Sequence, residues 1–207
     1  MKTILHLDTS IHSADGASSR LAARFVDAVR VATPGTEVIH RDLARQPVPH
    51  LTAERFAAFL AKPEARTPEQ QAIAGQSDAL IDELERADTI VLAVPMYNFG
   101  IPSTLKAYFD HVARAGRTFR YTEKGPQGLL AGRRAIVFAT RGGVYAGTPR
   151  DTQSAYLREF LGFLGITEVE FVYAEGLAMG EAPRAAAVAG AERAIEKLSA
   201  PSLAEAA

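Results

Sequence analysis

Asn98 lies between two aromatic residues, Tyr97 and Phe99, in a short segment that follows an apolar run. Aromatic side chains pack against flat apolar surfaces, and an amide can donate and accept hydrogen bonds at the edge of such a surface. Tyr97 and Phe99 alone could be ordinary core residues, but a core seldom contains an asparagine without a partner. The segment Met96–Phe99 therefore predicts a loop that holds a flat ring.

Small and hydroxyl-bearing residues are concentrated in the segment Thr9–Ser19, which precedes a predicted helix. The free N–H groups and the dipole at a helix N-terminus favour a bound anion, so this segment could bind a phosphate. Ser10 and Ser18 are the first candidates for side-chain contacts. Gly16, Ala17 and Ser18 could donate backbone N–H groups. A serine here could instead simply cap the helix.

A third candidate segment, Thr140-Arg141-Gly142-Gly143, follows another apolar run. Glycine lets the backbone approach a ligand closely, so Gly142 and Gly143 could present N–H groups to a ring. Thr140 adds a hydroxyl. A Gly-Gly pair considered alone is better explained by an ordinary turn after a strand.

Apolar runs typical of strands alternate with segments of helical periodicity. The predicted strands are Thr3–Leu7, Glu37–His40, Thr89–Val94, Arg134–Ala139 and Glu168–Ala174, and the helical candidates are Ser18–Val31, Thr52–Leu60 and Thr67–Arg86. This alternation predicts βαβ units and a parallel sheet. The candidate segments all follow strands, and the carboxyl ends of parallel strands form the edge at which open α/β sheets bind ligands.

The length and the apolar fraction of 47% fit a single domain spanning residues 1–207. The segment Ala44–Pro68 is punctuated by prolines and is expected to form a surface excursion. Gly116–Gly132 predicts a hairpin or an ordered flap. Ser199–Ala207 lacks periodic apolar residues and is expected to fray.

Composition excludes several classes of function. Lys and Arg number 23 against 24 Asp and Glu, so nothing favours a nucleic-acid or membrane partner. The chain has no cysteine, which excludes disulfides, thiol nucleophiles and iron–sulfur clusters. Any redox chemistry must therefore use a bound cofactor. We expect a cytoplasmic protein, because no signal-like segment and no run of membrane-spanning length is present.

Several motifs are also missing. No P-loop and no Gly-x-Gly-x-x-Gly follows a strand, and no Gly-x-Ser-x-Gly elbow indicates a hydrolase. The histidines show no paired spacing of metal ligands, so no metal site is predicted. They are His6, His12, His40, His50 and His111.

These segments, with Ala113–Thr122 and Phe160–Ile166, resemble the FMN-dependent NADH-azoreductase family of flavodoxin-like quinone reductases. Met96–Phe99 resembles the flavin-binding loop of that family, and Ile101–Asp110 resembles its continuation. The resemblance extends from near residue 3 to about residue 176. It implies a flavodoxin-like three-layer sandwich, in which a five-stranded parallel sheet of order 2-1-3-4-5 carries helices on both faces.

The resemblance also implies a bound FMN and a homodimer. The phosphate would lie at Thr9–Ser19, where Gly16 and Ala17 replace polar residues that the family usually has, so the main chain would contribute more. The isoalloxazine would contact both other candidate segments. In the family both subunits line the catalytic cleft, and Tyr121 and Phe163 are the candidate pocket residues.

The activity implied is that of an FMN-dependent NAD(P)H:quinone oxidoreductase that also cleaves aromatic azo compounds. NADH or NADPH would transfer hydride to FMN and leave before a quinone or azo acceptor enters, so the flavin carries the chemistry and no catalytic side chain is needed. Alternatives are a flavodoxin-type electron carrier without nicotinamide-dependent activity and a non-catalytic regulator. The near-neutral charge, the excursion and the flap favour the reductase.

Overall fold

The computed structural model describes residues 2–200 and contains one five-stranded parallel sheet. Its strands are β1 (Thr3–Asp8), β2 (Glu37–Asp42), β3 (Thr89–Pro95), β6 (Arg134–Thr140) and β7 (Glu168–Ala174). Their spatial order is β2-β1-β3-β6-β7. Counted within this sheet alone the order is 2-1-3-4-5, which confirms the predicted flavodoxin-like topology.

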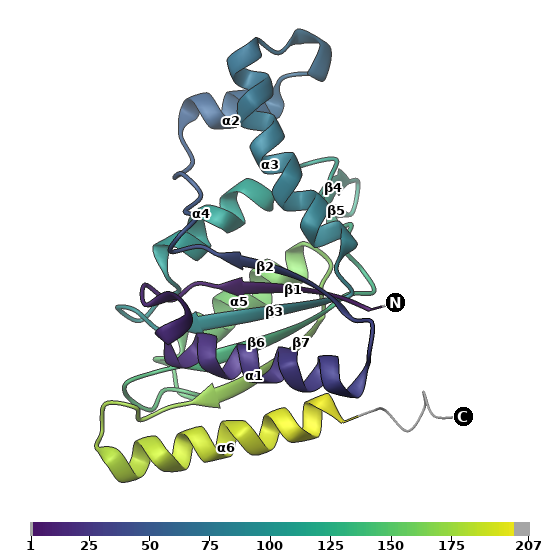
Figure 1. Cartoon of the computed structure of the whole chain (residues 1–207). Helices are drawn as coiled ribbons and strands as arrows, with labels where there is room; N and C mark the ends of the chain where they lie inside the picture. The colour runs from purple at the N-terminus through teal and green to yellow at the C-terminus, as the bar shows by residue number, and fades with distance from the viewer. Residues whose placement is uncertain (1, 201–207) are drawn as a thin grey trace.

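Helices cover both faces of the sheet, as Figure 1 shows. One face carries α1 (Ala17–Ala32) and α6 (Glu181–Ser199), and the other carries α3 (Pro68–Arg86), α4 (Ser103–Val112) and α5 (Thr152–Phe163). The central strand β3 therefore buries both of its faces. Leu92 packs on the side of α3, α4 and α5, whereas Val91 and Ala93 pack on the side of α1. This double burial explains why β3 is a continuous apolar run.

The predicted surface excursion forms α2 (Ala53–Leu60) and a 3-10 turn at Pro63–Ala65, beside the outer end of α3 (Figure 1). A capping box begins α3. The Thr67 hydroxyl accepts from Gln70 N–H at 3.2 Å, and the Gln70 side chain accepts from Thr67 N–H at 3.1 Å. Such caps are worth about 1 kcal/mol and hold the start of the helix in place.

The predicted flap is an antiparallel hairpin of β4 (Phe119–Thr122) and β5 (Gly125–Gly128). It packs against the turn after α5, because Leu130 N–H donates to Leu164 O at 2.9 Å. The first residue of the predicted frayed tail, Ser199, ends α6 and donates its hydroxyl to Ile195 O at 2.8 Å. Residues 201–207 lie outside the described part of the chain. Within residues 2–200, no helix is long and apolar enough to cross a membrane.

Candidate functional site

The three candidate segments meet at the carboxyl edge of the sheet, as predicted. Pro95 and Thr140 are register partners at the ends of β3 and β6. Met96 N–H donates to Thr140 O at 2.9 Å. The Tyr97 hydroxyl lies 3.3 Å from Ser10 Oγ and accepts a 3.3 Å hydrogen bond from Ile11 N–H. Tyr97 therefore connects the loop after β1 with the loop after β3.

The loop after β3 is a tight turn with an uncommon backbone. Tyr97 N–H donates to Gly100 O at 3.1 Å, and Gly100 N–H donates to Tyr97 O at 2.9 Å. The two residues between them, Asn98 and Phe99, have φ of 49° and 64°. Asparagine tolerates the left-handed region, but a bulky phenylalanine rarely occupies it. Such strain costs about 1–3 kcal/mol and is concentrated at functional sites.

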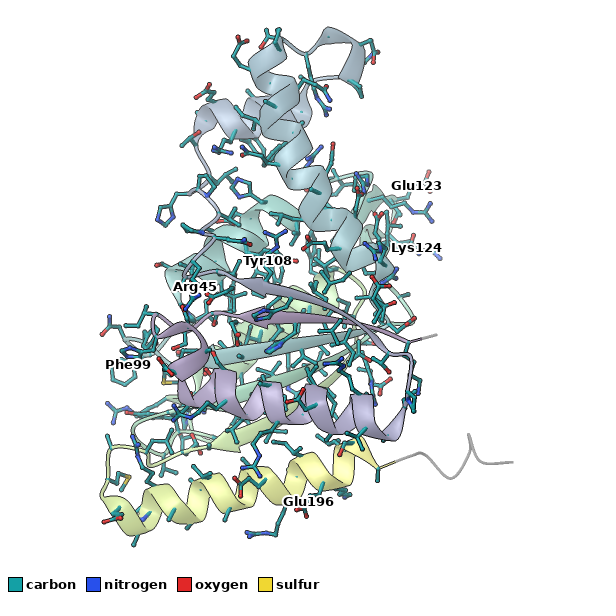
Figure 2. The ribbon with its side chains drawn as sticks, viewed as in Figure 1. Arg45, Phe99, Tyr108, Glu123, Lys124 and Glu196 are labelled. Atoms are coloured by element: carbon teal, nitrogen blue, oxygen red, sulfur yellow. The ribbon has the colours of Figure 1, made fainter. Side chains whose placement is uncertain are left out.

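The turn presents its side chains outward. Phe99 is 51% exposed and projects from the carboxyl edge of the sheet (Figure 2). Its ring meets Tyr145 edge-on at 5.8 Å, and the Arg150 guanidinium lies over it at 5.6 Å. The exposed Asn98 amide makes no side-chain hydrogen bond to any residue from 2 to 200. An aromatic face and an unpaired amide are thus both available to a ligand.

The N-terminus of α1 is suited to an anion. The helix begins at Ala17, and its N-cap is Gly16, which has no side chain to satisfy the first amides. Ser18 lies inside the first turn, so the alternative that it merely caps the helix is wrong. Its hydroxyl is buried and has no hydrogen-bond partner within the described residues. Unpaired amides and an unpaired hydroxyl fit a phosphate group.

Gly16 is required by packing at this loop. Its φ of −61° suits any residue, but an added Cβ would lie 2.4 Å from Ser10 Oγ. The buried Ser10 hydroxyl also accepts from His12 N–H at 3.2 Å. The small residue at position 16 therefore lets the loop fold closely against the start of α1.

The turn after β6 leaves two amides unused. The Gly142 carbonyl accepts from Ala178 N–H at 3.0 Å, and the Gly143 carbonyl accepts from Gly176 N–H at 2.9 Å. The N–H groups of Gly142 and Gly143 make no hydrogen bond to the described part of the chain. They could stabilise negative charge on a ring placed at this edge.

Arg141 has a different role from the one its position suggests. Its guanidinium is fully buried and forms ion pairs with Asp151 at 2.8 Å and with Glu175 at 3.0 Å. It also donates to Ser154 Oγ at 2.8 Å and to Gln153 Oε1 at 3.3 Å. Burial raises the pKa of the Asp151 carboxyl, but hydrogen bonds from Arg141 and Ser154 outweigh burial and hold that pKa below its ordinary value.

The backbone of Arg141 is occupied as well. Its N–H donates to Ala174 O at 3.0 Å, and its carbonyl accepts from Leu177 N–H at 3.1 Å. Glu175, its ion-pair partner, also accepts from Tyr145 N–H at 2.8 Å. Arg141 is therefore the side chain that holds the turn in place, and it has no free polar group for a ligand.

Sequence reasoning missed the residues of α5 that support this edge. Gln153 is buried and donates from its side-chain amide to Pro95 O at 3.0 Å. The Thr152 hydroxyl donates to Phe99 O. Asp151 caps the helix by accepting from Ser154 N–H at 3.0 Å, and an aspartate before a helix was the available signal for it.

The two predicted pocket residues do not join the site within one chain. Phe163 packs on Phe119 at 4.5 Å, and Tyr121 meets Phe119 edge-on at 5.4 Å. This cluster belongs to the hairpin near the amino edge of the sheet. Figure 2 shows the hairpin residues Glu123 and Lys124 at the end of the molecule opposite Phe99. Tyr121 and Phe163 of one chain could therefore line a pocket at the carboxyl edge only in a second copy of the chain.

One cluster of titratable groups was not expected from the sequence, which predicts no metal site. Because β1 pairs in parallel with β2, His6 lies opposite His40. Asp8 contacts both, at 3.3 Å from His6 Nε2 and 2.8 Å from His40 Nε2. Strand pairing therefore brings His6 and His40 together, although they are distant in the sequence and show no spacing typical of metal ligands.

A sheet of this order, with an uncapped helix N-terminus after its first strand and an aromatic turn after its third, defines a flavodoxin-like protein. The sequence profile of the family described as "Flavodoxin-like fold" matches residues 2–198. The chain belongs to this family.

Individual relatives within this family are similar to the chain over most of its length. A Cellvibrio japonicus protein named FMN-dependent NADH:quinone oxidoreductase is 52% identical over 189 residues, which cover 91% of this chain and 95% of that protein. An Alcanivorax borkumensis protein of the same name is 56% identical over 178 residues, covering 86% and 90%. The structure of an FMN-dependent NADH-azoreductase from Bacillus anthracis in complex with FMN has a TM-score of 0.86 and 26% identity, covering 96% and 100%. The predicted family resemblance is confirmed.

Proposed function

We propose that the chain is an FMN-dependent NADH:quinone oxidoreductase that also reduces aromatic azo compounds. The observation that carries the proposal is the strained turn at Asn98 and Phe99, held beside the uncapped N-terminus of α1. The names of the relatives support the same cofactor and the same donor. Quinones are therefore the substrates to test first.

The residues present fit a flavin mononucleotide. The unpaired Ser18 hydroxyl and the free amides at the start of α1 would hold the phosphate, with Ser10 beside them. Met96–Phe99 would form a wall of the ring site. The free N–H groups of Gly142 and Gly143 would bind the polar edge of the ring.

Bound FMN supplies the redox chemistry, because it accepts a hydride from a nicotinamide and passes two electrons to a quinone. The three loops at this edge would position the ring. None of the side chains at this edge is required as a proton donor, so we name no catalytic residue.

We further propose that the enzyme is a homodimer, in which Tyr121 and Phe163 of one subunit line the pocket of the other. Both residues pack against Phe119 of the hairpin, and the hairpin residues Glu123 and Lys124 lie on the side of the molecule opposite Phe99 (Figure 2), which supports this arrangement. Tyr121 is 75% exposed, as a residue that contacts a second subunit would be in an isolated chain. A reducing cytoplasm suits a chain without cysteine.

Anaerobic rapid mixing of the FMN-loaded protein with NADH tests the activity. We expect the flavin absorption to bleach and to recover when a quinone is added. If FMN binds but NADH does not reduce it, the oxidoreductase proposal is wrong and the electron-carrier alternative replaces it.

A double variant tests where the ring binds. Asn98→Ala removes the unpaired amide. Gly142→Val adds a side chain at a crowded position, where even an added Cβ would lie 3.3 Å from Ala178 Cβ. We expect weaker FMN retention at equal helix content. Gln71→Ala, which removes an exposed amide on α3, is the matched control. Unchanged flavin content in the double variant would contradict the placement but not the activity.

A further inference from the structure

His6, Asp8 and His40 converge on one face of the sheet, outside the proposed cofactor loops. Residues two apart on a strand point to the same face, so His6 and Asp8 project together from β1. His40 joins them from β2, because the parallel register pairs it with His6. The imidazole rings of His6 and His40 have centroids 4.8 Å apart.

The spacing of the three groups suits a common ligand. Asp8 Oδ2 lies 2.8 Å from His40 Nε2, and Asp8 Oδ1 lies 3.3 Å from His6 Nε2. One ligand atom from each residue lies within 4.8 Å of the others. In a tetrahedral zinc site, bonds of about 2.0–2.1 Å place neighbouring ligand atoms about 3.4 Å apart. Small side-chain adjustments would bring the three atoms to that geometry.

Two of these atoms are buried without a hydrogen bond. His6 Nε2 and Asp8 Oδ1 face each other, and neither has a hydrogen-bond partner among residues 2–200. Buried polar atoms are normally paired, because leaving one unpaired costs about 1–3 kcal/mol. A cation bound by both atoms would satisfy them together.

Asp8 also lies between the two histidines, because its two carboxylate oxygens contact one imidazole each. The alternative occupant of this space, a proton shared between the imidazoles and the carboxylate, is what the experiment must exclude.

An ion can reach the cluster from solvent. A groove of about 500 Å³ between the β1–β2 edge and α1 leads to it, and the His40 side chain is 51% exposed. The charged residues of α1 that line this groove are Arg20, Arg24, Asp27 and Arg30. Arg20 is bonded to the Asp15 carbonyl and Arg24 to the Glu192 carboxylate, so neither guanidinium is committed to Asp8.

We propose that His6, Asp8 and His40 bind a divalent transition-metal ion, with Zn²⁺ as the probe of choice and water completing the coordination. Two imidazoles and one carboxylate match the ligand preference of zinc, and three protein ligands leave an open position. Mg²⁺ and Ca²⁺ prefer all-oxygen sites and should not compete. The site is independent of the proposed oxidoreductase activity.

Zinc titration of the FMN-loaded protein, prepared without a histidine tag and treated with a chelator, tests the proposal. Competition against a chromophoric chelator should show one Zn²⁺ per chain. His40→Ala should lower the affinity on the order of 100-fold or more, because removing even a residue that supports a ligand costs about 10–100-fold. The exposed His50→Ala is the matched control and should bind zinc as the unaltered chain does.

Further measurements keep the proposal falsifiable if a variant folds poorly. Zinc should raise the melting temperature of the unaltered chain and of His50→Ala, but not of Asp8→Asn, and Mg²⁺ should have no such effect. Affinity should fall as the pH is lowered, because imidazole binds metal only when deprotonated. Substoichiometric binding, or equal losses in His40→Ala and His50→Ala, would overturn the proposal and leave a hydrogen-bonded cluster. Flavin content in the same samples separates this result from the proposed activity.

Discussion

Arg141→Met should be one of the most destabilising single substitutions near the candidate site. The guanidinium is fully buried, while its partners Asp151 and Glu175 are only 8% and 13% exposed. Removing one partner of a buried ion pair typically costs about 3–5 kcal/mol, because the remaining charge is left uncompensated. The carboxylates retain other donors, since Asp151 still accepts from Ser154 N–H and Glu175 from Tyr145 N–H. We therefore expect a loss of about 3 kcal/mol in the free energy of unfolding at pH 7.

The loss should depend on pH in a defined direction. The pKa of the Asp151 carboxyl is lower in the folded protein than the ordinary value of 3.8. The stability that this carboxylate contributes is present above the pKa of the unfolded chain and disappears as the pH falls through the folded pKa. The difference between the unaltered chain and Arg141→Met should therefore shrink below about pH 4.

Urea unfolding followed by far-UV circular dichroism measures the loss, and flavin fluorescence reports FMN release from the same samples. Arg158→Met is the matched control, because Arg158 is exposed and lies over the Phe171 ring without a carboxylate partner in the described structure. It should cost about 1 kcal/mol or less. The reasoning is refuted if Arg141→Met costs no more than Arg158→Met, or if its cost is undiminished at pH 3.5.

Three glycine substitutions separate packing from conformation. Gly16→Ala places a Cβ 2.4 Å from Ser10 Oγ, so it should lower the free energy of unfolding by about 1–3 kcal/mol. It should also weaken FMN retention in equilibrium dialysis. Full retention would contradict the predicted phosphate loop. Gly128→Ala places a Cβ 2.1 Å from Gly165 N, so limited proteolysis should find the hairpin more readily cleaved, and an unchanged digest would count against its docking. Gly75→Ala meets no atom within 4 Å on α3 and should raise the free energy of unfolding in urea by about 0.5–1 kcal/mol. Destabilisation would mean that helix propensity does not govern this site.

The strands could be predicted because strands buried in a sheet are rich in apolar residues. β3 packs on both faces, so it contains only apolar residues between Thr89 and Pro95. β2 is an edge strand and is only partly buried, which explains why its prediction ended at His40 although the strand continues to Asp42. The position of the candidate loops followed from the parallel arrangement alone, because the strands all end at one edge.

The last helix could not be predicted in the same way. Ala191 and Ile195 are the only residues of α6 that are fully buried, and alanine provides little apolar periodicity. The backbone conformation of the turn after β3 could not be predicted from the sequence either. Propensity favours Asn98 in a left-handed conformation but not Phe99. The hydrogen bonds between Tyr97 and Gly100, together with the one from Thr152 to Phe99 O, hold the turn in place. The sequence indicated which loops lie at this edge of the sheet but not the backbone strain within them.

The cluster of His6, Asp8 and His40 and the ion pair of Arg141 with Glu175 both depend on strand register. Hydrophobic periodicity does not predict register, but the bounds of the predicted strands come close to it. If the predicted strands that start at Thr3 and Glu37 are aligned at those residues, His6 falls opposite His40, as observed. Aligning the predicted strands at their starts, Arg134 and Glu168, likewise places Arg141 opposite Glu175, and these two residues form an ion pair. Pairing predicted parallel strands from their starts is thus the missing step, because partners distant in sequence become neighbours only through the register.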